Sequence, residues 1–148
     1  MTDDGRGYVW SLVPGEGTPV IDTGAARWWI EDGVLCSQNY ADATITADHV
    51  RAGFSAARRL SGARVAPLIA EGAHQTLATR EARELVSGPE AAAHYAAMAV
   101  VAQSPVARML MKFFTRLTAP PFPVAVFATA DEARRWARGH RSTRESSP

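Results

Sequence analysis

The sequence predicts one α/β domain, in which an N-terminal antiparallel hairpin leads into a mostly parallel mixed sheet with about four helices packed on it. Short apolar runs of strand length alternate with amphipathic helical segments from residue 46 to residue 138. Strands separated by helices of this length pair in parallel through right-handed crossovers. An Asp-Gly pair between two strand-like segments near residue 32 predicts the antiparallel hairpin.

Composition limits the classes of function. The chain has 148 residues, of which 47% are hydrophobic and 21% charged, as in an ordinary globular domain. The formal net charge is only +1, so no overall positive field predicts a nucleic-acid partner. Cys36 is the one cysteine, which excludes an internal disulfide and a multi-thiolate metal site. We expect neither a cofactor nor nucleic acid.

The N-terminus and the hydropathy pattern predict a cytoplasmic protein. The first ten residues, MTDDGRGYVW, lack both the basic region and the apolar core of a secretion signal. The longest uncharged apolar run is about ten residues, which is too short to span a membrane. We therefore expect no membrane span.

Three regions are expected along the chain. Residues 1–25 form an N-terminal extension, either partly disordered or folded as an extra hairpin over Tyr8–Asp22 around a Pro-Gly turn signal. Residues 26–139 form the α/β domain. Residues 140–148 are polar and predict a disordered tail.

The first part of the domain predicts a hairpin followed by a helix. Arg27–Ile30 and Val34–Asn39 have strand composition on either side of the Asp-Gly turn. Neither face of the hairpin is strictly apolar, so we expect it at the edge of the sheet. Thr46 then caps a helix over residues 47–61, which ends at Gly62.

Two buried strands and a short helix follow. Residues 65–70 predict a strand in which Pro67 indicates a bulge or an unpaired position, because proline cannot donate to the ladder. Residues 71–77 predict a loop, residues 79–87 a short helix and residues 89–93 a further turn. Residues 96–102 predict the next strand.

The helix predicted over Pro105–Thr118 is more apolar than a helix lying on a sheet needs. At 100° per residue, four of its side chains fall within about 60° of one another and are expected to face the sheet. These are Val106, Leu110, Phe113 and Leu117. Ala107, Met109, Met111 and Phe114 widen the apolar arc to about 200°, so Met111 and Phe114 are surplus.

The surplus apolar side chains Met111 and Phe114 have three interpretations. They contact a neighbouring helix, they form a partner surface such as a homodimer interface, or they line an apolar pocket. Arg108, Lys112 and Arg116 form a basic stripe on the same helix. A solvated helix face explains this stripe, and anionic lipid or nucleic acid is the alternative. The last strand, residues 124–128, and a helix that starts at the Thr129–Glu132 capping box complete the domain.

Several local patterns between Arg27 and Arg138 resemble the STAS/SEC14-like families, whose founding members are bacterial anti-sigma-factor antagonists. The resemblance is to a small bacterial branch of these families. The patterns are Trp29-x-x-Asp32-Gly33, Glu81-Ala82-Arg83, Ala99-Val100-Val101 before a helix, and Phe122-Pro123 leading to Phe127, Glu132-Ala133 and Trp136. The resemblance implies helices largely on one side of a mixed sheet and a protein-binding or ligand-binding role without catalysis. It also implies a phosphorylatable serine after an aspartate, but residues 70–79 contain no Asp-Ser pair. Thr79 stands at the expected helix N-cap and Thr76 lies nearby, so either could replace that serine.

The leading hypothesis is a non-enzymatic STAS-like regulatory module that binds an unknown protein partner and also self-associates. Its candidate surfaces are the helix at 105–118, through Ala107, Met111 and Phe114, and the loop at 71–79. The second hypothesis is a carrier of a small apolar ligand or lipid. The third is an enzyme that uses His74 with Glu71, at the end of a parallel strand where ligands tend to bind.

Each candidate has a plain alternative. His74 is equally explained as an exposed loop histidine, and Thr79 as an ordinary N-cap. Cys36 has no nearby histidine in the sequence and is explained as a small buried hydrophobe. The four histidines lie far apart in the sequence, without ligand spacing, so no metal site is expected.

Overall fold

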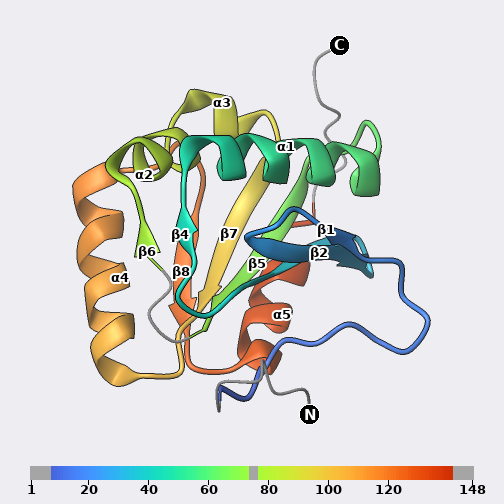
Figure 1. The fold of residues 1–148 in the computed structure, drawn as a ribbon, viewed down its shortest axis with the longest axis horizontal. Coiled ribbons are helices and arrows are strands. Elements are labelled where there is room, and N and C mark those ends of the chain that lie inside the picture. The colour runs from blue at the N-terminus through green and yellow to red at the C-terminus, as the bar shows by residue number, and fades with distance from the viewer. Residues whose placement is uncertain (1–7, 74–76, 142–148) are drawn as a thin grey trace.

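The computed structural model of the chain describes residues 8–73 and 77–141. Within them, a six-stranded mixed sheet has the order β1-β2-β3-β5-β7-β8 (Figure 1). Its strands are β1 (Ile21–Asp22), β2 (Ala26–Glu31), β3 (Val34–Asn39), β5 (Ala66–Gly72), β7 (Tyr95–Val101) and β8 (Val124–Phe127). The first three strands pair antiparallel and the last three continue from β3 in parallel. A separate two-stranded parallel sheet joins β4 (Thr44–Ile45) to β6 (Leu77–Ala78).

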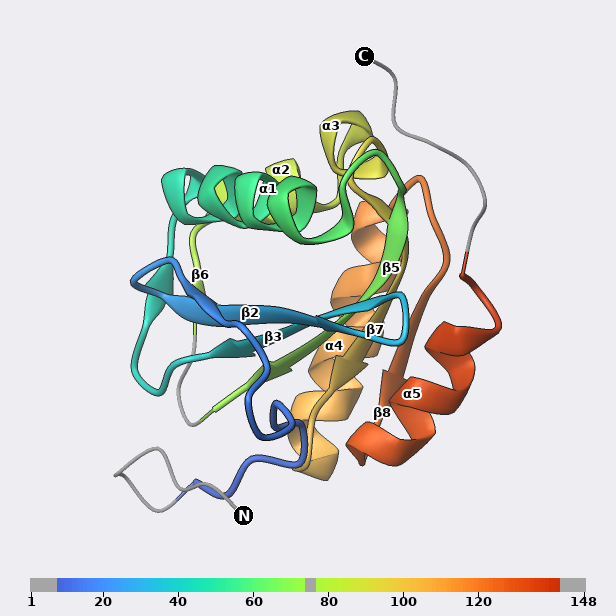
Figure 2. The same ribbon diagram turned by 90° about the vertical axis from the view of Figure 1, so that its right-hand side faces the viewer.

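The described residues contain five helices, one more than the sequence predicted. They are α1 (Ala47–Ser61), α2 (Arg80–Val86), α3 (Pro89–Ala92), α4 (Pro105–Thr118) and α5 (Ala130–Arg138). Side chains of α1, α2 and α3 share one core with the sheet, and side chains of α5 belong to a second core. Figure 2 shows α1, α2 and α3 well apart from α5. α4 lies against the edge strand β8. The predicted α/β class and the antiparallel start of the sheet are thus confirmed.

The hairpin turn has the predicted chemistry, but the hairpin is not at the sheet edge. Asp32 and Gly33 have φ angles of 51° and 74°, as a two-residue type I′ turn requires. β3 pairs with β2 on one side and β5 on the other, and its residues 34–38 are buried. The edge prediction was wrong because the short strand β1 pairs outside β2. For the same reason, residues 8–22 do not form a hairpin of their own.

Two adjacent tryptophans in β2 anchor the two cores. Trp28 belongs to the core under α1, while Trp29 belongs to the core under α5, because successive side chains of a strand point to opposite faces. Gly53 of α1 lies directly over Trp28: a Cβ added at Gly53 would lie 2.6 Å from Trp28 Cζ2. α1 approaches the sheet this closely only because position 53 has no side chain.

β5 contains the predicted irregularity and is longer than predicted. The register against β7 shifts between Ala66 and Leu68, on either side of Pro67. The strand continues through Gly72, because Gln38 and Asn39 of β3 pair with Glu71 and Gly72. Glu71 is therefore a strand residue and not the first residue of a loop.

The segment before β1 packs on the domain. Tyr8, Trp10 and Leu12 are exposed by at most 8% of their surface. At the other end, the His140 ring lies 4.2 Å from the Trp136 ring and Arg141 pairs with Asp32 at 3.1 Å. The predicted disorder of residues 1–7 and of the tail beyond Arg141 lies outside the described residues.

Candidate functional site

The most unusual surface of the described residues is the outer side of α4. None of the 14 residues of this helix is buried. Five large apolar side chains along it are exposed by 48% to 66%: Val106, Met109, Leu110, Phe113 and Leu117. We call these five residues the α4 face. A monomer seldom leaves so many neighbouring apolar side chains in water, so the α4 face is a candidate binding surface.

The orientation of α4 is opposite to the one expected from its sequence. Val106, Leu110, Phe113 and Leu117 were predicted to face the sheet, and all four are exposed. Ala107, Met111 and Thr115 are half-buried and lie on the side of the helix that rests on the domain. Phe114 lies between the two sides with 39% of its surface exposed. The helix has the predicted apolar arc, but its largest apolar side chains point into solvent and not toward the sheet.

Local interactions fix both ends of α4. The Ser104 hydroxyl accepts from the backbone N–H of Ala107 at 3.4 Å, with Pro105 in the first turn. Arg108 donates to the carbonyl oxygens of Ala102 at 2.8 Å and Gln103 at 3.0 Å, which ties the helix to the end of β7. Ala119 ends the helix in the left-handed conformation, at φ 43° and ψ 63°.

The charges on α4 are all positive. Arg108, Lys112 and Arg116 are its charged residues, and it has no carboxylate. On the other flank, the Arg83 guanidinium of α2 lies 5.8 Å from the centre of the Phe114 ring, a cation–π geometry. The α4 face therefore has cations beside it on both flanks.

The candidate site residues of the segment 71–79 do not share one environment. Glu71 is fully buried, and Thr79 is the N-cap of α2, whose hydroxyl accepts from the Ala82 N–H at 3.1 Å. The plain interpretation of Thr79 as an N-cap is thus confirmed, and its phosphorylation stays a prediction. His74 and Thr76 lie outside the described residues. Glu71 and Thr79 are not brought together in one open site.

The Glu71 carboxylate binds the N-terminal segment. It accepts hydrogen bonds from the backbone N–H groups of Leu12 at 2.7 Å and Ser11 at 3.2 Å, and from the Tyr8 hydroxyl. Gln103 Nε2 donates to it at 2.8 Å and also to the Val9 carbonyl at 2.8 Å. This network covers the carboxyl end of β5, which is where an open parallel sheet usually binds ligands.

Gln38 and Ser11 extend the same network, which sequence reasoning missed. Gln38 Nε2 donates to the Leu12 carbonyl at 2.7 Å, while its Oε1 accepts from Arg27 Nε at 2.9 Å. The Ser11 hydroxyl accepts from the backbone N–H of Ala130 at 2.7 Å, at the start of α5. The sequence signal for this network was the presence of Gln38 and Glu71 within otherwise apolar strands, because buried polar side chains need hydrogen-bond partners.

Cys36 is a buried thiol beside an ion pair. Its Sγ lies 3.5 Å from Glu31 Oε1, which accepts from Arg134 Nε at 2.7 Å. Burial, and secondly the Glu31 carboxylate, raise the pKa of Cys36 far above its usual value. The thiolate is therefore disfavoured, which agrees with the interpretation of Cys36 as a small hydrophobe.

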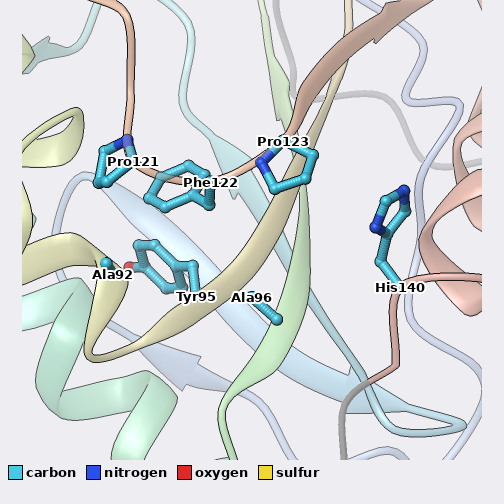
Figure 3. A pocket seen from close by; sticks show the side chains of 7 residues that line it. All are labelled: Ala92, Tyr95, Ala96, Pro121, Phe122, Pro123 and His140. Carbon is cyan, nitrogen blue, oxygen red and sulfur yellow. The ribbon is translucent and has the colours of Figure 1, made fainter.

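Two hollows of the described residues can be compared with the closed chamber of a lipid carrier. One open depression of about 410 Å³ lies at the amino ends of β7 and β8 and is lined by Ala92, Tyr95, Ala96, Pro121, Phe122, Pro123 and His140. Figure 3 shows the Tyr95 and Phe122 rings together and His140 set apart beyond Pro123. A second hollow, beneath the C-terminal end of α1, leaves no room for a water molecule. Neither hollow is the closed cavity that a lipid carrier needs.

In residues 8–73 and 77–141, no three His, Cys, Asp or Glu side chains lie where they could hold a metal ion. Among the helices of these residues, none has the length and apolar character that crossing a bilayer requires.

Comparison with known proteins gives one match. No curated protein and no solved structure matches the chain. A family model described as a domain of unknown function, DUF7793, matches residues 28–141, which include the sheet from β3 to β8 and the α4 face. The chain therefore belongs to the DUF7793 family.

Proposed function

We propose that this chain is a non-enzymatic, STAS-like regulatory module that binds a partner protein through the α4 face. One observation carries the proposal: a 14-residue helix has no buried residue, and its largest apolar side chains point into solvent. Fully burying one Val, Leu or Phe side chain gains about 1.5–3 kcal/mol relative to leaving it exposed. A partner that covers the α4 face gains this free energy several times over.

The carboxyl edge of the sheet supports a role without catalysis. The Glu71 carboxylate is enclosed and accepts four hydrogen bonds, three of them from residues 8–12. A general acid or base must reach its substrate directly or through one water, and Glu71 is covered by the N-terminal segment. The α4 face is therefore a better partner surface than the segment 71–79.

The resemblance to the STAS-like group supports the regulatory part of the proposal. The mixed sheet, with its hairpin and its parallel strands, is consistent with the resemblance, although the resemblance implies helices largely on one side and α5 packs in a different core from α1, α2 and α3. Partner binding on an exposed helix is compatible with this architecture. A carrier function lacks comparable support, because neither hollow is closed and apolar.

The test is site-specific crosslinking followed by reconstitution. A photoreactive residue replaces Phe113 in the cell, and the same residue at Arg59 of α1 is the control. A protein that crosslinks only at position 113 is purified, and its binding to the native chain and to Leu110→Ser/Phe113→Ser is measured. We expect the double variant to lose binding at unchanged thermal stability, because both side chains are exposed.

A matched control separates lost binding from lost folding. Val9→Ser/Val20→Ser removes two other exposed apolar side chains and should leave binding unchanged. Equal binding by Leu110→Ser/Phe113→Ser and the native chain would refute the proposal. So would a large loss of stability in Leu110→Ser/Phe113→Ser, because the α4 face would then be part of the core.

A further inference from the structure

The α4 face contains a narrow seam that fits one helix. Val106, Leu110, Phe113 and Leu117 follow one another at spacings of four, three and four residues. This is the alternation of a and d positions in a coiled-coil heptad, and at 100° per residue it confines the four side chains to an arc of about 60°. Over the 12 residues from Val106 to Leu117 the ridge is about 17 Å long, which corresponds to about three turns of a partner helix.

The cations beside the seam have no acidic counterparts on the same helix. Lys112 and Arg116 are exposed, and neither forms an ion pair within the described residues. Arg108 is held by two carbonyl oxygens, which leave its charge uncompensated. The neighbouring helix α2 adds two arginines and two glutamates, and therefore no net charge. The potential around the seam is thus positive.

We infer that the partner of the α4 face is an acidic amphipathic helix of another protein. This inference rests on the proposed function and specifies its partner. Leu or Ile side chains of the partner fill the spaces between the seam residues, and Glu or Asp side chains on its flank face Lys112 and Arg116. Complementary charge sets the orientation and the rate of association, and apolar burial supplies most of the affinity.

Two other occupants fit the seam less well. A second copy of the chain would bring Lys112 and Arg116 of both copies together with no carboxylate on either α4. An anionic membrane surface attracts the same cations, but recognition of anionic lipid by charge takes a cluster of about four to eight Lys or Arg. Arg108 is tied to two backbone carbonyls on the opposite side of α4 from the seam, so the helix offers lipid two exposed cations, Lys112 and Arg116.

The experiment uses the full chain and two labelled peptides of 15 residues. Both carry Leu at the four seam positions; one has Glu and the other Lys at the flanking positions. Fluorescence anisotropy should show that the Glu peptide binds at least about tenfold more tightly than the Lys peptide. Several surface ion pairs, worth up to about 1 kcal/mol each, are attractive with the Glu peptide and repulsive with the Lys peptide. Raising the salt concentration should reduce this ratio.

Charge reversal on the protein provides the matched test. Lys112→Glu/Arg116→Glu should reverse the preference toward the Lys peptide. Arg59→Glu/Arg64→Glu, in the last turn of α1 and three residues after its end, should leave the preference unchanged. Sedimentation velocity of the chain alone tests whether it forms a dimer. Flotation with vesicles of one part phosphatidylglycerol to three parts phosphatidylcholine tests whether it binds an anionic membrane.

The outcomes separate this inference from the proposed function. Equal affinity for the two peptides, or tighter binding of the Lys peptide, overturns the acidic partner. Vesicle binding that Leu110→Ser/Phe113→Ser abolishes would also overturn the acidic partner. A dimer that the same double variant abolishes would overturn it too, but the α4 face would then still be a protein interface. If the double variant changes neither peptide binding, sedimentation nor flotation, the proposed function fails together with the inference.

Discussion

The backbone N–H of Leu12 donates to the Glu71 carboxylate at 2.7 Å, although 59 residues separate them in the sequence. Glu71 is fully buried, so its charge is compensated by protein donors alone among the described residues: two backbone N–H groups, the Tyr8 hydroxyl and Gln103. A buried carboxylate is stable only with such partners. The N-terminal segment is thus held on the sheet by one side chain of β5.

Glu71→Gln should therefore destabilise the protein and loosen its N-terminal segment. The amide keeps one acceptor oxygen but turns an NH₂ group toward donors, and each unsatisfied buried group costs about 1–3 kcal/mol. We expect unfolding in urea to show a loss of about 3 kcal/mol. Amide hydrogen exchange at Ser11 and Leu12 should accelerate by more than exchange in α1.

Glu81→Gln is the control, because Glu81 is exposed on α2. It should change stability by less than about 0.5 kcal/mol. An equally small effect of Glu71→Gln would contradict the account of the network.

Gly53→Ala should destabilise the protein despite the better helix propensity of alanine. In a free helix this change gains about 1 kcal/mol. Here the new Cβ would lie 2.6 Å from Trp28 Cζ2, so α1 or the indole must move. Overpacking of this kind costs about 1–3 kcal/mol, and we expect a net loss in thermal unfolding. Ser55→Ala, at an exposed position of the same helix, should be neutral or stabilising, and a Gly53→Ala protein more stable than the native chain would refute the close contact.

Much of the fold was predictable because local signals and tertiary structure agree. Thr46, Ser104 and Thr129 are N-caps as predicted, and the Asp-Gly pair forms the expected turn. Sequence periodicity could not show which side of α4 meets the sheet. A wide apolar arc marks an amphipathic helix but not its direction, and here Ala107, Met111 and Thr115 rest on the domain.

The candidate site was harder to predict, for a related reason. Glu71 was identified as chemically interesting, but its partners lie at residues 8–12, and no local pattern links segments so far apart. The same limit applies to the ion pairs of α5. Arg135 lies four residues after Asp131, at the usual spacing of an ion pair on a helix, but Asp131 pairs with Arg134, which also reaches Glu31 of the hairpin. Tertiary contacts decided both cases.

Protonation of His94 should lower the stability of the protein. The imidazole ring stacks on Phe54 with 4.5 Å between ring centres, and partial burial lowers the pKa of His94, as does the nearby Arg58, against an opposing effect of Glu90. The unfolded chain then binds more protons than the folded one between the lowered pKa and the ordinary value of 6.5. Stability should therefore be fully present above pH 6.5 and fall as the pH drops through this window.

His94→Phe keeps a ring on Phe54 and removes the titration. Urea unfolding at a series of pH values should give a flatter profile for this variant below pH 6.5 than for the native chain. His49→Gln, which changes a histidine at the start of α1, is a comparison for the general effect of losing one imidazole. Identical pH profiles for the native chain and His94→Phe would contradict the proposed linkage.

Ala119→Gly should stabilise the end of α4. Ala119 has φ 43° and ψ 63°, in the left-handed region that costs a residue with a Cβ about 1–2 kcal/mol and costs glycine little. Glycine is also more flexible in the unfolded chain, so we expect a net gain of about 0.5–1 kcal/mol in urea unfolding. Ala93→Gly is the matched control: Ala93 ends α3 with φ −74° and ψ −15°, where alanine is unstrained and glycine should destabilise. If both substitutions destabilise by the same amount, α4 does not end in the left-handed conformation in solution. A gain confined to position 119 would show that α4 ends in the left-handed conformation in solution.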